Sequence, residues 1–341
     1  MGSSTKIRDF ILGNVEEHPE SIARFVMKEF GVSRQVISHH IRNLIKEGLL
    51  VAEGETRRRK YELKPIAERI IPLAINSELQ EHHVWMEYFA DYFKQFKDNI
   101  ISICNYGLTE MLNNAIDHSE GSNVVVCYNH FPNRIRLSVS DNGIGIFHKL
   151  TRALKLADER EAILELSKGK LTTDPETHTG EGIFFTTRMF DKFSILSGDL
   201  YFSHVSLHDW LIQDREDESD GTYIQMDIRI DSNRMVEEVF DEFSGEEYGY
   251  GFKRTHVPLL LAKYGHEKLV SRSQAKRVLA RFDRFDEVLL DFEGVDFMGQ
   301  AFADEIFRVY RQKHPETEIH WIRANPRIDT TIKTIINNAS V

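Results

Sequence analysis

Two glycine-bearing turns constrain the fold of this chain more than any other feature of its sequence. Residues 141–146 (DNGIGI) directly follow residues 134–140, whose alternating apolar side chains predict a strand. Residues 177–183 (THTGEGI) lead directly into residues 184–190, whose apolar side chains predict a helix. Glycine allows backbone conformations and close approaches that a Cβ atom would hinder. Each turn therefore predicts a place at the end of a regular element where backbone atoms come close to another group.

An acidic and an amide side chain precede these turns in the segment LTEMLNNAIDHS. Glu110 and Asn114 are four residues apart, so a helix places both on one face, and Asp117 continues that face. Hydrolysis of ATP requires a base that orients water and an oxygen ligand for Mg²⁺. Glu110 fits the first role as the candidate catalytic residue, and the amide oxygen of Asn114 fits the second.

The glycine turns and a later threonine supply the remaining chemistry of a nucleotide site. Asp141, at the end of its strand, can accept a hydrogen bond from the adenine amine, while Gly143 and Gly145 let the backbone close around the base. Glycines before a helix expose N–H groups and the positive end of the helix dipole, which suit phosphates. Further candidate contacts with ATP are Thr179, Gly180, Gly182 and Thr222. Lys168 and Lys170 lie between the two turns and are either phosphate ligands or solvated loop lysines.

The four segments, in this order and spacing, resemble the motifs of the GHKL superfamily. These Bergerat-fold ATPases include gyrase B, MutL, heat-shock chaperones, histidine kinases and anti-sigma-factor kinases. EMLNNAID–H resembles the N box, DNGIG the first glycine box, TGEG the second, and GT the threonine motif that follows. The resemblance covers roughly residues 80–230 and implies a Mg²⁺-dependent ATPase with a lid between Phe147 and Thr179. It does not separate phosphotransferases from conformational ATPases.

A two-component histidine kinase would also carry a phosphoacceptor histidine on an upstream helix. His82 and His83 lie within residues 65–100, a segment that its aromatic spacing predicts to be helical and packed. The acidic residue and the downstream proline of the phosphoacceptor motif are missing. We therefore interpret both histidines as surface or packing residues.

Strands and helices alternate from about residue 250 onward, which predicts an α/β layer structure. The acidic, glycine-rich residues 243–251 (FSGEEYGYG) predict the boundary before it. Residues 288–310 resemble the STAS domains that anti-sigma kinases phosphorylate, and more closely an STAS-like domain of unknown function fused to GHKL modules. In that comparison Ala301 occupies the position of the phosphorylated serine. The resemblance therefore implies the fold without the acceptor, and we expect a docking or dimerisation module that a protein partner could bind.

The first part of the chain has the pattern of a helix-turn-helix. Residues 21–30 predict a helix, Gly31 a turn, and Ser33 the cap of a second helix that ends near Glu47. The side chains expected to face inward are Val36, Ile37, Ile41, Leu44 and Ile45. Those expected to face DNA are Arg34, Gln35, Ser38, His39 and Arg42, which are donors suited to phosphates and base edges.

Two short strands are expected after these helices, around a polar tip at residues 53–60. The tip resembles the wing of winged-helix regulators, which follows the DNA backbone by charge. Its basic residues are Arg57, Arg58, Arg59 and Lys60. The alternative left open is a winged helix that makes only protein contacts.

Charge and composition limit the remaining classes. The net charge of −11 argues against a protein that coats nucleic acid indiscriminately, although the first 64 residues are mildly basic. Cys104 and Cys127 lack paired spacing, which argues against a disulfide framework or a cysteine zinc site and fits the cytoplasm. No apolar run approaches the ~20 residues that cross a bilayer, so we expect no membrane partner.

The sequence therefore predicts an α/β multi-domain chain: a winged helix at 1–64, a GHKL ATPase of α+β Bergerat type at 65–235, and an STAS-like α/β domain at 245–341. The leading hypothesis is a regulator that binds ATP and double-stranded DNA. Its nucleotide state would alter homodimer formation or DNA contact. Two alternatives stay open: an anti-sigma-type serine/threonine kinase that acts on a separate partner, and a defence or repair ATPase activated by DNA.

Overall fold

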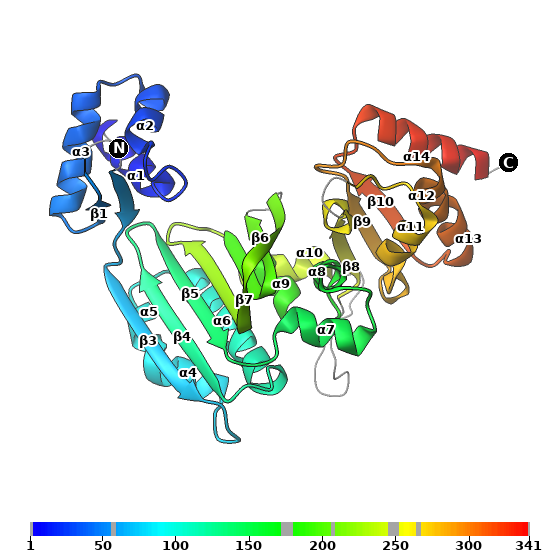
Figure 1. Cartoon of the computed structure of the whole chain (residues 1–341), viewed down its shortest axis with the longest axis horizontal. Helices are drawn as coiled ribbons and strands as arrows, with labels where there is room; N and C mark the ends of the chain where they lie inside the picture. The colour runs from blue at the N-terminus through cyan, green and yellow to red at the C-terminus, as the bar shows by residue number, and fades with distance from the viewer. Residues whose placement is uncertain are drawn as a thin grey trace.

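The computed structural model describes residues 3–55, 59–171, 180–205, 209–244, 252–263 and 267–339. Three regions follow one another along the chain (Figure 1): a helical head, a central sheet backed by helices, and a C-terminal α/β unit. The described helices do not include one that is both long and apolar enough to cross a membrane.

The head contains helices that form as the sequence predicts, followed by an antiparallel ribbon. Its elements are α1 (Ser3–Asn14), α2 (Ile22–Phe30), α3 (Arg34–Lys46), β1 (Leu50–Glu53) and β2 (Lys60–Leu63). The hydroxyl of Ser33 accepts a hydrogen bond from the Val36 N–H and caps α3. Ile37, Ile41 and Leu44 are buried as expected. The expectation for Val36 was wrong: this side chain, in the first turn of α3, is 40% exposed.

The central sheet is antiparallel throughout. Its strand order is β3-β4-β5-β7-β6. The strands are β3 (Ala67–Ala74), β4 (Asn123–His130), β5 (Arg134–Asp141), β6 (Lys192–Val205) and β7 (Asp209–Arg229). Buried and half-buried side chains alternate along β4, so one face of the sheet forms the core. The long helix α6 (Asp98–His118) packs on that face, against β5 and against α9 (Gly182–Met189).

The expectation of a continuous helix over residues 65–100 was wrong at its start. Ala67–Ala74 form the edge strand β3, in which Ala67, Ile71 and Leu73 turn toward the core. An edge strand tolerates Pro72, which cannot donate to a ladder. Helical structure begins only at α4 (Glu81–Val84) and continues through a π-helical turn (Trp85–Phe89) into α5 (Ala90–Phe93). The predicted aromatic stripe is buried there at Trp85, Phe89 and Phe93.

The described part of the segment between the two glycine turns, up to residue 171, contains two helices. These are α7 (Ile146–Leu154) and α8 (Glu159–Lys168). The carboxylate of Asp158 caps α8 by accepting from the N–H groups of Arg160 and Glu161. Helix α8 packs against the C-terminal unit, where it contacts strand β8.

The C-terminal unit has the predicted alternation of strands and helices. Its parallel sheet has the order β10-β9-β8. Its elements are β8 (Arg254–Pro258), α11 (Arg272–Leu279), β9 (Glu287–Asp291), α12 (Gln300–Asp304), a π-helical turn (Glu305–Tyr310), α13 (Arg311–Lys313), β10 (Glu318–Ile322) and α14 (Pro326–Ala339). Helix α10 (Val236–Phe243) precedes it and packs against α9 and β8.

The head is attached to the central sheet through the turn between β4 and β5. Phe131 in this turn is buried within the hydrophobic cluster of the head. Arg134 and Arg136 both bind Glu16 of the head, and Arg136 also binds Asp227 on β7 through two hydrogen bonds. The head therefore shares apolar and ionic contacts with the sheet.

We expect the packing of α6 to be sensitive to one added methyl group. In Gly107→Ala the new Cβ would lie 2.4 Å from Cε2 of Phe190, whose ring is buried and cannot move aside freely. Overpacking of this kind costs about 1–3 kcal/mol. Calorimetry of the unfolding of the central region should show a lower transition temperature.

Gly13→Ala is the matched control, because its Cβ would meet no atom within 4 Å in helix α1. Helix propensity there favours alanine by up to about 1 kcal/mol. Equal behaviour of the two variants would contradict the close packing of α6 on Phe190.

Candidate nucleotide site

A cavity of about 260 Å³ lies between helix α6, the turn after β5, helix α7 and the start of α9. Its lining comes from segments that are far apart in the sequence. The polar lining residues include Glu110, Asn113, Asn114, His118, Ser119, Asp141, Lys149, Glu181 and Thr222. The apolar ones include Met111, Ala115, Val139, Ile146, Leu150, Leu166, Leu171, Ile183 and Ile224. The lining therefore offers apolar side chains that suit a flat ring together with charged and amide groups.

Helix α6 presents one face to this cavity. Glu110, Asn114 and His118 follow one another at the four-residue spacing that the sequence indicates, and all three line the cavity. Asp117 does not line the cavity but is exposed, contrary to its expected role in ATP binding. At this last turn of α6 the wall is formed by His118 and Ser119 instead.

The side chain of Asn114 is incompletely satisfied. Its Nδ2 atom is buried and has no hydrogen-bond partner among the described residues. A buried amide without a partner costs free energy, and a bound ligand can recover that cost. The oxygen and nitrogen atoms of the asparagine amide are similar in size. Rotation of the amide can therefore present either atom of Asn114 to a ligand.

Asp141 is held rigidly at the end of β5. The antiparallel register places it opposite Thr222 of β7. Its Oδ1 accepts hydrogen bonds from the N–H of Gly143 at 2.9 Å and from the N–H of Thr222 at 3.3 Å. Burial raises the pKa of the Asp141 carboxyl, and these N–H donors oppose the rise. The hydroxyl of Thr222 in turn accepts from the N–H of Ile146, which fixes the start of α7.

Glycines of the two turns lie very close to other groups at the cavity. Gly182 opens α9, and a Cβ there would lie 2.1 Å from Oε2 of Glu110, so a larger residue would displace that carboxylate. Gly145 has a φ of +82°, a conformation that L side chains rarely adopt. Gly145, Gly180 and Gly182 line the cavity, whereas Gly143 lies just outside it against the carbonyl of Ser119.

The lysines between the turns lie elsewhere. Lys170 does not line the cavity: its ammonium donates to the carbonyl of Arg284 and lies 4.8 Å from the centre of the Phe285 ring. Lys168 is neither a phosphate ligand nor a solvated loop lysine, because its side chain is completely buried. Both residues face the C-terminal unit, a contact that sequence spacing does not indicate. Thr179 lies outside the described residues.

Sequence reasoning missed a cation that lines the cavity. The ammonium of Lys149 donates to the carbonyl of His118 at 2.6 Å, next to the end of α6. The feature of the sequence that could have identified Lys149 is its position one turn into the amphipathic helix after the first glycine turn. Leu166 and Leu171 were also missed, since they belong to a segment that appeared to be polar.

The residues present are consistent with ATP and Mg²⁺. Within the described ranges, no group of three or more His, Cys, Asp or Glu side chains could hold a metal ion. Mg²⁺ in nucleotide sites takes few protein ligands and is held mainly by phosphate oxygens and water. The amide oxygen of Asn114, a residue that lines the cavity, would serve as one such ligand, and the N–H groups at the start of α9 suit phosphates.

Two parts of the chain match known protein families. Residues 77–200 match the family model of the histidine kinase-like ATPase domain, and residues 274–329 match that of an STAS-like domain of unknown function. No curated protein matches the chain. Both matches confirm the resemblances identified from the sequence motifs. The chain therefore contains a GHKL-type ATP-binding domain followed by an STAS-like region.

Proposed function

We propose that this protein is a regulator that binds ATP in its central domain and double-stranded DNA through its head. ATP binding would change the association of two copies or their contact with DNA. The observation that carries the proposal is the cavity in which Glu110, Asn114, Asp141 and both glycine turns meet. Exposed basic and amide side chains on α3 support the part that concerns DNA.

Asp141 would recognise the adenine base. Its carboxylate is already oriented by two backbone N–H donors, so binding would need little reorganisation. The apolar side chains of Met111, Ile183 and Ile224 would pack on the faces of the ring. A buried charged acceptor that meets a donor contributes more to affinity than a neutral one.

Glu110 and Asn114 would act at the phosphate end. Mg²⁺, when bound, would neutralise phosphate charge. Asn114 would hold the ion through its amide oxygen. Glu110 would orient the attacking water, and its contact with Gly182 keeps it beside the N–H groups at the start of α9.

We expect Asp141→Asn to reduce the preference for adenine. Wild-type protein should bind a non-hydrolysable ATP analogue about 10- to 100-fold more tightly than the inosine analogue, which presents a carbonyl in place of the amine. The asparagine amide can donate to that carbonyl, so the ratio should fall toward one. Calorimetric titration of both analogues tests this.

Asp91→Asn is the control for this change, because the Asp91 side chain is 85% exposed on α5. Its ratio of affinities should equal that of the wild type. An unchanged ratio in folded Asp141→Asn protein would contradict the assignment of Asp141 to adenine.

We expect Glu110→Ala and Glu110→Gln to retain nucleotide but to lose hydrolysis. A positioned base contributes about 10²- to 10⁴-fold to the rate. A phosphate-release assay under saturating ATP measures the loss, and calorimetry measures the binding that remains. Glu238→Ala, an exposed change on α10, should leave both unchanged. Undiminished turnover in the Glu110 variants would remove Glu110 from the catalytic role.

Most of the described side chains proposed to contact DNA are exposed. Arg34, Gln35, His39 and Arg42 are exposed on α3, and Ser38 is half-buried. On the ribbon, Arg59 and Lys60 are exposed, and Lys60 pairs with Glu20 at 3.3 Å. Arg57 and Arg58 lie outside the described residues. Basic side chains on α3 and the ribbon support a recognition helix beside a backbone-following wing.

We expect the double variant Arg34→Ala, Arg42→Ala to bind every duplex more weakly. Each lost phosphate contact should flatten the dependence of log affinity on log salt by about 0.9. Gln35→Ala should instead change the preferred sequence if this side chain reaches a base. Duplex selection and salt titrations on the full chain measure both effects.

Lys6→Ala is the control for these changes, because Lys6 is an exposed cation on α1 and is not among the residues predicted to contact DNA. Its salt slope should match the wild type. A folded full-length chain that selects no duplex at low salt would overturn the DNA-binding part of the proposal.

The two alternative functions would give different products in these assays. An anti-sigma-type kinase would transfer labelled phosphate from ATP to a separate protein. A defence or repair ATPase would release phosphate faster once duplex is added. The STAS-like region is a poor acceptor in the first case, since Ala301 lies exposed in the first turn of α12 and has no hydroxyl.

A further inference from the structure

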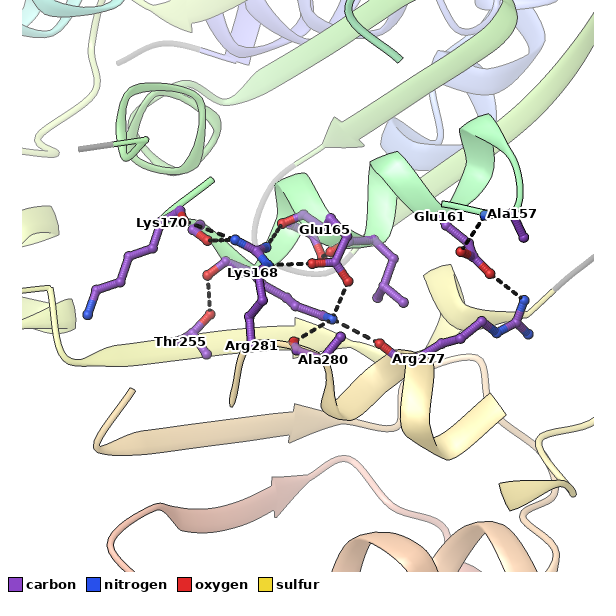
Figure 2. Close-up of polar contacts among 12 residues, drawn as sticks. Ala157, Glu161, Glu165, Lys168, Lys170, Thr255, Arg277, Ala280 and Arg281 are labelled. Atoms are coloured by element: carbon purple, nitrogen blue, oxygen red, sulfur yellow. Dashed lines mark hydrogen bonds and ion pairs between the residues drawn. The ribbon is translucent and has the colours of Figure 1, made fainter. Parts of the chain in front are cut away.

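Helix α8 contacts both the nucleotide cavity and the C-terminal unit. Leu166 near its end and Leu171 just after it line the cavity. Other side chains and backbone carbonyls of the same segment face the C-terminal unit (Figure 2). One short stretch of chain is therefore part of the cavity wall and of a contact with residues more than a hundred positions later.

The first element of this contact is the buried ammonium of Lys168. It donates to Oε1 of Glu165 at 2.6 Å. It also donates to the carbonyl oxygens of Arg277 and Ala280, both at 3.0 Å, at the end of α11 (Figure 2). These carbonyls lie at a helix C-terminus, where a cation is favoured. The hydroxyl of Thr255 on β8 donates to the carbonyl of Lys168 at 2.7 Å. Burial lowers the pKa of Lys168 to about 8, and Glu165 opposes that effect.

The second element is the guanidinium of Arg281, which binds the end of α8. Its Nε donates to Oε2 of Glu165 at 2.6 Å, and its Nη2 donates to the carbonyl of Glu165 at 2.8 Å. Its Nη1 donates to the carbonyls of Lys170 at 2.9 Å and of Gly169 at 3.3 Å. Arg284 donates to the same Lys170 carbonyl at 3.1 Å. Two arginines of the C-terminal unit thus hold the backbone that ends α8.

A continuous set of bonds joins these arginines to the second glycine turn. Leu171 directly follows Lys170, and its N–H donates to the carbonyl of Gly180 at 3.0 Å. Gly180 lies so close that a Cβ there would be 2.4 Å from the backbone of Leu171. Both residues line the cavity. The position of the Gly180 turn therefore depends on backbone that Arg281 and Arg284 hold.

We infer that Arg281 and Arg284, which lie in the STAS-like region, are positioning residues for the ATP site. They hold the wall from Leu166 to Leu171, and through it the Gly180 turn, in the arrangement that receives the nucleotide. This inference rests on the ATP site of the proposed function. It adds a dependence of nucleotide affinity on residues outside the part of the chain that matches the ATPase family.

Because of the ionic cluster of Glu165, Lys168 and Arg281, we expect nucleotide affinity to change sharply when the contact is broken. Lys168 is fully buried and Glu165 is 6% exposed at its side chain, so each charge relies on its partners and not on water. When one partner of such a network is lost, an uncompensated buried charge remains. The contact is thus expected to be either formed or lost, and linkage requires that nucleotide and the contact strengthen each other by the same factor.

The test measures the affinity of full-length variants for a non-hydrolysable ATP analogue. Arg281→Ala should weaken binding by about 5- to 150-fold, the usual range for coupling between sites. Arg284→Ala removes one exposed hydrogen bond, so it should fold normally and weaken binding less. Arg272→Ala is the matched control on α11, because the partners of Arg272 among the described residues are Asp304 and Glu305 of its own unit. Its affinity should equal that of the wild type.

A second readout separates positioning from loss of folding. Hydrogen exchange of wild-type protein should slow on addition of the analogue at residues 165–171 and also at residues 277–284. The two arginine variants should lose the protection at 277–284. Wild-type affinity in Arg281→Ala, or in Arg284→Ala if the former does not fold, would overturn the inference. If the wild type itself binds no analogue, the ATP site of the proposed function fails instead.

Discussion

The antiparallel register between β5 and β7 is the constraint on which the nucleotide site depends. It sets Asp141 opposite Thr222, so that one carboxylate oxygen accepts from the N–H of Thr222 on β7 and from the N–H of Gly143 in the turn after β5. The same register places the Thr222 hydroxyl where it caps the start of α7. A slip of one residue would turn Asp141 to the other face of the sheet. The position of Asp141 in the cavity wall is therefore a consequence of strand pairing.

Helix packing forms the part of the cavity around Glu110 and Asn114. Helix α6 contacts both β5 and α9, which brings Glu110 and Asn114 to the first turn of α9. The contact is close enough that Gly182 has no room for a side chain beside Glu110. The unsatisfied amide of Asn114 is consistent with a site that is completed by a ligand. Strand register and helix packing thus position the two ends of the cavity separately.

The C-terminal unit contacts the end of α8, which lines the cavity, through a buried ionic cluster. Such clusters contribute little net stability, because desolvation of the charges offsets their attraction. They do discriminate strongly between a correct contact and an incorrect one, since every charge must find its partner. A network formed by Glu165, Lys168 and Arg281 is therefore suited to fixing one arrangement of α8. A contact of this kind needs no phosphorylated hydroxyl, and Ala301 at the start of α12 offers none.

The sequence by itself determined the features that depend on neighbouring residues. The cap at Ser33, the face of α6 with Glu110 and Asn114, both glycine turns and the C-terminal alternation of strands and helices all follow from short-range patterns. Only the tertiary structure decided which elements meet. Ala67–Ala74 became a strand because β4 offers it a ladder, and Lys168 became buried because the end of α11 supplies its acceptors. Both outcomes depend on burial and pairing between residues far apart in the sequence, which the spacing of neighbouring residues does not reveal.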